Sequence, residues 1–396
     1  IDVIVGAYQY DNGQTDEGAA FVYQGYATGI NTLAVATMES NQATAYMGIA
    51  VSSAGDVNGN GYSDVIVGAN LFDNGQTNEG AAFIYHGSAA GINTTPATAV
   101  ESNQAGAFMG VSVAGAGDVN ADGYSDVIVG ANSYDNGQAD EGAAFIYHGS
   151  ATGISTTAAA ILESNQSSAG FGISVASAGD VNGDGYSDVI IGARLFDNGQ
   201  LDEGAAFVYH GSAAGIVTTA ATTLESNQAD AQMGISVASA GDVNGDGYGD
   251  IIVGANFYDN GQTDEGRAYI YHGAASGINS TAAATVESNQ ADAWFGWSVA
   301  SAGDVNGDGF SDVIVGARSF DNGQSDEGRA FVYHGSASGI NSTAAATVES
   351  NQVSANLGYS VATAGDVNGD GYSDVIVGAF FYDNGQPDEG AAFVYH

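Results

Sequence analysis

Apolar and polar residues alternate in short runs along the whole chain, and the runs recur with a fixed period. In one unit, small residues alternate in GWSVASAGD (296–304), β-branched residues fill DVIVGA (312–317), and apolar and polar residues alternate again in RAFVYHG (329–335). A weaker run, ATVES (346–350), ends the unit. Short runs of this kind, separated by Gly-rich turns, predict four β-strands per unit and no helix of useful length.

An acidic loop marks the length of the repeat. Its copies have the form Asp-x-Asn-x-Asp/Asn-Gly-x-x-Asp and begin at residues 56, 118, 180, 242, 304 and 366, so each unit is 62 residues long. Four antiparallel strands repeated about seven times are typical of the blades of a propeller. We therefore predict an all-β fold, a seven-bladed β-propeller of four-stranded antiparallel blades, as a single domain over residues 1–396. A solenoid is the alternative, but its parallel-strand units are usually shorter.

The acidic loops carry oxygen-bearing side chains at alternate positions and Gly at the sixth position. The alternate spacing turns three side chains towards one centre, and the Gly permits the positive φ that folds the loop back. A hard cation such as Ca²⁺ is bound by oxygen ligands arranged in this way. The alternative is a solvated turn without a metal. Six copies of one pattern favour calcium, and we expect about six bound ions (Ca²⁺).

The chain is strongly acidic, which narrows the classes of partner. It has 46 Asp and Glu residues, 4 Arg and no Lys, for a net charge of −42. This charge repels nucleic acid and anionic membrane surfaces, whereas cations, glycans and basic proteins remain suitable partners. No apolar run approaches the 18 residues of a membrane-spanning helix, so we expect no membrane insertion. The absence of Cys excludes disulfides and thiolate metal sites.

The motifs around the loops resemble a known family. Phe-Gly, or Met-Gly or Leu-Gly in its place, precedes the small-residue run, as at Phe171-Gly172 and Phe295-Gly296, and VIVGA follows the loop. Together these motifs resemble the FG-GAP repeat of the integrin α-subunit propeller, in a bacterial form, over the whole chain. The Pro of the family's Gly-Ala-Pro is absent. The resemblance implies a seven-bladed propeller with calcium in the hairpin between the first and second strands of a blade.

Each loop is expected to bind its ion through side-chain oxygens at positions one, three, five and nine and through the backbone carbonyl at position seven. A β-branched strand follows the loop at once, which disfavours the helical EF-hand and dockerin types. The first loop has Asn60 where the others have Asp, so we expect it to bind most weakly. The expected ligands are Asp56, Asn58, Asn60, Tyr62 and Asp64; Asp118, Asn120, Asp122, Tyr124 and Asp126; Asp180, Asn182, Asp184, Tyr186 and Asp188; Asp242, Asn244, Asp246, Tyr248 and Asp250; Asp304, Asn306, Asp308, Phe310 and Asp312; and Asp366, Asn368, Asp370, Tyr372 and Asp374.

A second acidic motif, the turn DNGQ-x-(D/N)-E-G, occurs seven times between residues 11 and 390. We interpret it as a hairpin turn whose carboxylates accept hydrogen bonds from backbone N–H groups. The alternative is a second cation site on the opposite face, built for instance from Asp197, Asp202 and Glu203.

The few basic residues are interpreted as structural. One His occupies the same position in six units, too far from its equivalents to share one metal ion. The Arg residues are expected to pair with the acidic turns. The residues concerned are His86, His148, His210, His272, His334 and His396, and Arg194, Arg267, Arg318 and Arg329.

These observations favour a non-enzymatic function, because no unique acid, base or nucleophile stands apart from the repeats. We predict a calcium-stabilised, extracellular or cell-surface binding, adhesion or scaffold propeller with a protein or glycan ligand. A carbohydrate-binding lectin with sugar sites between blades is the first alternative, and an enzyme is the second.

Both ends of the chain fall within a repeat. Asp2 aligns with Asp64, the ninth position of a loop, and His396 aligns with His334 near the end of the third strand. The second and third strands therefore occur seven times but the first and fourth only six times. We expect incomplete first and last blades, whose free edges would favour self-association.

Overall fold

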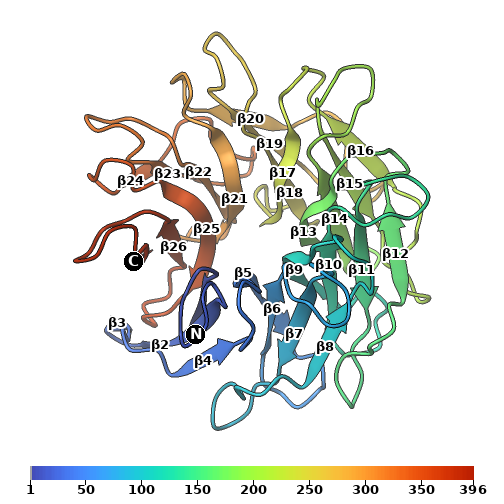
Figure 1. The fold of residues 1–396 in the computed structure, drawn as a ribbon. Coiled ribbons are helices and arrows are strands. Elements are labelled where there is room, and N and C mark those ends of the chain that lie inside the picture. Colours follow the sequence, from blue (N-terminus) through green and yellow to red (C-terminus); the bar gives the residue numbers. More distant parts are fainter. Residues whose placement is uncertain (1) are drawn as a thin grey trace.

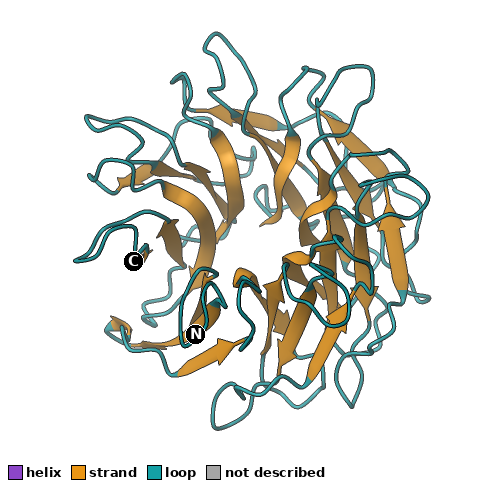
Figure 2. Ribbon diagram, viewed as in Figure 1, coloured by secondary structure: helices purple, strands orange, loops and turns teal. Residues whose placement is uncertain are grey.

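The computed structural model describes residues 2–396 as a ring of seven antiparallel β-sheets, with no helix among these residues (Figures 1 and 2). Each sheet is one blade, and consecutive strands of the chain are neighbours within it. The prediction of an all-β, seven-bladed propeller is confirmed. Residues 2–396 contain no helix that could cross a membrane.

Six blades contain an inner strand that lines the ring (Figure 1). These inner strands are β5 (Met47–Gly55), β9 (Met109–Gly117), β13 (Phe171–Gly179), β17 (Met233–Gly241), β21 (Phe295–Gly303) and β25 (Leu357–Gly365). The second strands are β1 (Asp2–Ala7), β6 (Asp64–Ala69), β10 (Asp126–Ala131), β14 (Asp188–Ala193), β18 (Asp250–Ala255), β22 (Asp312–Ala317) and β26 (Asp374–Ala379).

The third strands do not alternate apolar and polar residues as predicted: in three blades all five residues of the strand are apolar and buried, because both faces of the sheet pack against neighbouring blades. A short outer strand follows each third strand in six blades. The third strands are β2 (Ala19–Tyr26), β7 (Ala81–Tyr85), β11 (Ala143–Tyr147), β15 (Ala205–Tyr209), β19 (Arg267–Tyr271), β23 (Arg329–Tyr333) and β27 (Ala391–Tyr395). The outer strands are β4 (Ala36–Glu39), β8 (Thr98–Glu101), β12 (Ala160–Glu163), β16 (Thr222–Glu225), β20 (Ala284–Glu287) and β24 (Ala346–Glu349), and the short β3 (Gly29–Ile30) pairs with β2.

The hydrophobic core lies between blades. Each cluster of buried side chains joins two neighbouring sheets: Ile190 and Val208 of one blade pack with Met233, Val237 and Val253 of the next. Branched and aromatic residues therefore fill the space between stacked sheets, as they do in a β-sandwich. Because every blade buries one face against each neighbour, a single blade has no complete core of its own.

Two glycines of the repeat meet at each blade interface. A Cβ atom on Gly192 of β14 would lie 2.8 Å from the carbonyl carbon of Gly234 in the next blade. Gly234 itself has a φ of 87°, a conformation that favours glycine. The Phe-Gly and Gly-Ala motifs are thus two sides of one backbone contact. This contact recurs between consecutive blades from Gly6 to Gly358.

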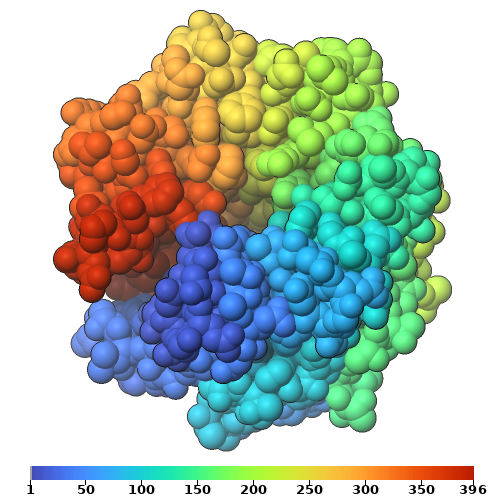
Figure 3. Space-filling view, viewed as in Figure 1, coloured from blue at the N-terminus to red at the C-terminus, as the bar shows by residue number. Residues whose placement is uncertain are grey.

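The first and last blades close the ring, and the N- and C-terminal parts lie next to each other (Figures 1 and 3). The buried cluster at this seam consists of Val3, Ala364 and Val367. It is smaller than any of the other six clusters. The strand β1 has no inner neighbour within its sheet, and the sheet of β25, β26 and β27 has three strands.

Candidate cation-binding loops

The acidic loops connect the inner strand to the second strand of six blades, at the end of the ring where the inner strands finish. In the loop between β13 and β14, the Asp180 carboxylate accepts N–H bonds from Asp184 at 3.1 Å and Gly185 at 2.8 Å. The Asn182 Oδ1 atom accepts from Asp184 at 2.9 Å, and the Asp184 Oδ1 atom accepts from Tyr186 at 3.1 Å. Side chains at positions one, three and five are therefore held over their own loop by backbone donors.

The ninth-position Asp lies beneath the loop and is buried. The Asp188 Oδ2 atom accepts the Val181 N–H at 2.9 Å, and its Oδ1 atom accepts the Gly211 N–H at 2.9 Å. Burial raises the pKa of Asp188 to about 6, although these two N–H bonds and nearby His210 act in the opposite direction. This carboxylate links the loop to the third strand, and its expected role as a ligand remains a prediction.

The donors at the loop suit a hard cation. Carboxylate and amide oxygens, with no nitrogen or sulfur donor among them, are the ligands that calcium prefers. The backbone bonds fix the side chains of Asp180, Asn182 and Asp184 on one loop, so a cation could be held by these oxygens together with the Tyr186 carbonyl. Among residues 2–396, no three His, Cys, Asp or Glu side chains converge closely enough to hold a metal by themselves.

The first loop differs from the others in its fifth residue. The Asn60 Oδ1 atom accepts the Tyr62 N–H at 2.8 Å, as Asp does elsewhere, and its Nδ2 atom donates to the Gly87 carbonyl at 3.1 Å. The loop therefore keeps its shape with one negative charge fewer. Its expected weaker calcium binding remains a prediction.

Neighbouring loops are joined to one another around the ring. The Gly249 N–H, at position eight of one loop, donates to the Asp180 carbonyl of the preceding loop at 2.9 Å. The Tyr248 ring of the same loop lies against Gly183 of the preceding one. Similar backbone bonds join the other consecutive loops from Asp56 to Ser373. The loops form a connected belt on one end of the propeller.

Five of the six repeated His residues lie against a glycine of another blade. The His148 ring lies against Gly215 of the following blade, and His396 lies against Gly29 across the seam. His396 Nδ1 is also 3.0 Å from a carboxylate oxygen of the buried Asp374. These contacts agree with the structural role that the sequence suggested.

The acidic turns of the opposite end are held by their own carboxylates. The Asp197 Oδ1 atom accepts the Asp202 N–H at 2.7 Å, and the buried Glu203 accepts the Asn198 N–H at 2.7 Å. These bonds support the interpretation of the motif as a carboxylate-capped turn. Burial, with the charges of Asp197 and Asp230, raises the pKa of Asp202.

The Arg residues do not pair with these turns as expected. Arg267 forms an ion pair at 2.7 Å with Glu287 of the outer strand β20, and Arg329 pairs with Glu349 of β24. The interpretation was wrong because the Arg at the start of the third strand is directly opposite Glu in the antiparallel register of the outer strand. Arg318 instead lies among aromatic rings, a feature that sequence reasoning missed. The sequence feature that could have indicated this cluster is the position of both Trp residues, Trp294 and Trp297, in one repeat.

Comparison with known proteins agrees with the sheet order and the motif positions. The FG-GAP repeat profile matches residues 47–85, 109–147, 171–209, 233–271, 295–333 and 357–395. The chain belongs to the FG-GAP repeat family. Each match begins with an inner strand, includes one acidic loop and ends with a third strand.

Relatives of this chain include several integrin α subunits. It is 34% identical over 221 residues to integrin alpha pat-2 of Caenorhabditis briggsae, covering 51% of this chain and 17% of that protein. It is 33% identical over 235 residues to integrin alpha-V of Gallus gallus, covering 57% and 21%. The matched region thus spans about a fifth of these relatives or less. Among solved structures, the C-terminal WD40 domain of Sif2 aligns with 95% of this chain and with 89% of that domain's chain. The identity is 14% and the TM-score 0.44, so this likeness carries no information about function.

Proposed function

We propose that this chain is a calcium-stabilised, extracellular binding or scaffold propeller without catalytic activity. The observation that carries the proposal is the belt of six loops, each of which holds oxygen-bearing side chains over its own backbone. Membership of the FG-GAP family and similarity to integrin α subunits support a binding function. A protein or glycan at the cell surface is the ligand class that suits a strongly acidic ring of near-equivalent blades.

Calcium would act by holding together side chains that repel one another. Asp180 and Asp184 bring two carboxylates into one short loop, and the chain carries a net charge of −42. A cation bound only by the folded state stabilises that state by about 2.7 kcal/mol per site when its concentration is 100 times Kd. The connected loops would pass this stabilisation to neighbouring blades.

Removal of calcium tests the proposal. Excess chelator should lower the melting temperature strongly, added Ca²⁺ should restore it, and Mg²⁺ should restore it poorly because it favours stricter octahedral geometry. The matched control is Asp197→Asn in an acidic turn, which removes one charge outside the loops and should leave the calcium response intact. A melting curve that chelator does not change would contradict the proposal.

The absence of an asymmetric catalytic group supports a non-enzymatic role. Five of the six His residues pack against glycines at blade interfaces, and the buried Glu203 accepts a hydrogen bond from the turn backbone. The strands β1 and β27 lie at the edges of their sheets in residues 2–396. Sheet edges of this kind suit self-association, which would make sedimentation depend on concentration. Sedimentation that is constant across concentrations would rule this association out.

A further inference from the structure

The repeats differ from one another most clearly at three positions around the start of β21, the inner strand of the sixth blade. The residue after Gly-Ala is Arg318, where three other blades have Asn; the residue before Phe-Gly is Trp294; and the third residue of β21 is Trp297, where the four preceding inner strands have Ile or Val. These positions lie at the end of the ring opposite the acidic loops. The strand β21 begins beside them, at Phe295, and ends at Gly303, directly before the acidic loop of its blade.

Arg318 is enclosed by aromatic rings. Its guanidinium carbon lies 3.7 Å from the Trp297 ring centre, 4.4 Å from that of Trp294 and 5.5 Å from that of Tyr359. The two Trp rings stack with centres 5.9 Å apart. Tyr359 stacks in turn on Phe380 at 4.8 Å, and both of these residues belong to the seventh blade. The guanidinium is therefore fixed in position before any ligand arrives.

This Arg has no carboxylate partner among residues 2–396, although the chain is rich in acidic residues. Arg267 and Arg329 both form ion pairs, but Arg318 forms none within 4.0 Å. Its Nε atom is buried without a hydrogen-bond partner. A partly buried guanidinium with free donors matches a carboxylate, which it can bind through two parallel hydrogen bonds.

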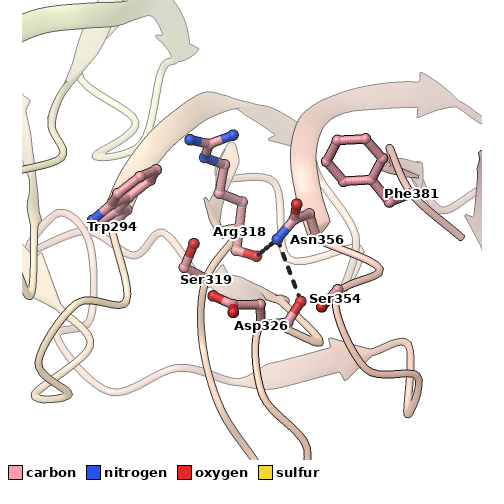
Figure 4. A pocket seen from close by; sticks show the side chains of 7 residues that line it. All are labelled: Trp294, Arg318, Ser319, Asp326, Ser354, Asn356 and Phe381. Carbon is pink, nitrogen blue, oxygen red and sulfur yellow. Dashed lines mark hydrogen bonds between the residues drawn. The ribbon is translucent and has the colours of Figure 1, made fainter. Parts of the chain in front are cut away.

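A cavity of about 370 Å³ lies beside Arg318, between the sixth and seventh blades. It is lined by Trp294, Arg318, Asp326 and Phe381 and by the neutral polar Ser319, Ser354 and Asn356. Figure 4 shows the Arg318 side chain between Trp294 and Asn356, with its guanidinium directed away from Asp326. The Asn356 amide donates to the Arg318 carbonyl at 2.9 Å and so supports the wall of the cavity (Figure 4).

We propose that this cavity binds a sugar residue that carries one carboxylate, such as a uronic or sialic acid, with the carboxylate on Arg318. The Trp294 indole, which lines the cavity, offers an apolar face for the C–H side of a sugar ring. Asp326, Ser319 and Ser354 supply acceptors and donors for hydroxyl groups. The proposal specifies a ligand for the binding module proposed above, and it does not depend on calcium.

The composition of the cavity favours a sugar acid over an acidic peptide. A single Arg matches a single carboxylate, and the Asp326 carboxylate in the same cavity would repel a second one while accepting hydroxyl protons. The volume is near the lower limit for a small-molecule site, which suits one ring rather than a length of chain.

Tryptophan fluorescence provides a direct test, because Trp294 and Trp297 are the two Trp residues of the chain. The protein in calcium is titrated with D-glucuronate, N-acetylneuraminate, D-glucose and a capped Gly-Asp-Gly peptide. An acidic sugar should change the fluorescence with saturation, and D-glucose, which lacks the carboxylate, should bind at least about tenfold more weakly. Arg318→Gln should remove the preference. Arg194→Gln, at the same repeat position but without neighbouring Trp, should leave it unchanged.

Each outcome decides the proposal. Equal binding of D-glucose and D-glucuronate, or an unchanged preference in Arg318→Gln, would overturn the role of the guanidinium. Saturation by the peptide alone would replace the sugar acid by an acidic peptide. No response up to about 50 mM, well above a millimolar Kd, would show that the Arg–Trp cluster is only structural. If Arg318→Gln fails to fold, the titrations of the unmodified protein with D-glucuronate and D-glucose still test the preference for a carboxylate. The melting experiment with chelator is read separately, so the failure of one proposal is distinguishable from the failure of the other.

Discussion

The glycine contact between blades makes a prediction that can be worked from the structure. In Gly316→Ala, the new Cβ would lie 2.9 Å from the carbonyl carbon of Gly358 in the next blade, and closer still to its oxygen. Carbon atoms in contact prefer about 3.5–4.0 Å, so the two blades must separate by at least about half an ångström. Because both partners are backbone, no rotamer change relieves the overlap.

Gly316→Ala should lower the free energy of unfolding by about 3 kcal/mol, the upper end of the range for overpacked substitutions. An unfolding entropy of about 2.1 cal/mol/K per residue gives roughly 0.8 kcal/mol/K for a ring of this size that unfolds as one unit. The melting temperature should therefore fall by about 4 °C in differential scanning calorimetry at fixed calcium concentration.

Gly378→Ala is the matched control. At Gly378 the three atoms nearest to the new Cβ all belong to Ser360 of its own blade, and Ser298 occupies the same place beside Gly316. The two variants thus differ in the contact with the next blade, and Gly378→Ala should melt within about 1 °C of the unmodified protein. Equal losses in the two variants, or no loss in Gly316→Ala, would refute the reasoning.

Three further predictions concern charge. Asp184→Ala should remove one of about six calcium ions in titration calorimetry, whereas a full count would show that the ligand assignment is wrong. Asn60→Asp should tighten calcium binding at the first loop, which we expect to be the weakest site, by about tenfold, since ligand charge tunes affinity in such loops; unchanged affinity would contradict this. The pKa of Glu349 is lowered in the folded protein, chiefly by its hydrogen bond to Arg329. The pair therefore stabilises the folded state above the pKa of the unfolded carboxyl, and this stability is lost as pH falls through the pKa of the folded one. Arg329→Gln should therefore lower the free energy of unfolding above this pKa by at most about 1 kcal/mol, because the pair is partly exposed. Melting curves recorded across pH would show this, and identical pH profiles for the two proteins would reject the contribution.

The blades and their strands could be predicted from the sequence because local pattern and packing agree in every repeat. The run at 296–304 became β21 (Phe295–Gly303), and 312–317 matched β22 (Asp312–Ala317). Period-two patterns, Gly-rich turns and a constant repeat length all specify the same blade. The seven-sheet ring then follows from the need of each blade to bury both faces.

The environment of the basic residues could not be predicted in the same way. Arg267 and Arg318 look equally free to pair with an acidic turn in the sequence, but only the register of β19 against β20 places Glu287 beside Arg267. Arg318 meets Trp294 and Trp297 through contacts between the ends of different strands. Such contacts depend on how blades stack, which a single repeat does not encode.

The repeat is constrained where blades touch and free to vary where they do not. Gly316 cannot gain a side chain without separating two blades, so the Phe-Gly and Gly-Ala motifs must recur in each. The residue after Gly-Ala lies just beyond that contact, at the rim, and it is Asn, Arg, Phe or Tyr in different blades. A near-symmetric ring can therefore build one asymmetric site only from such rim positions. Arg318 and Trp294 occupy two of them, which is the physical reason to look for a ligand at this end of the propeller rather than along its repeated walls.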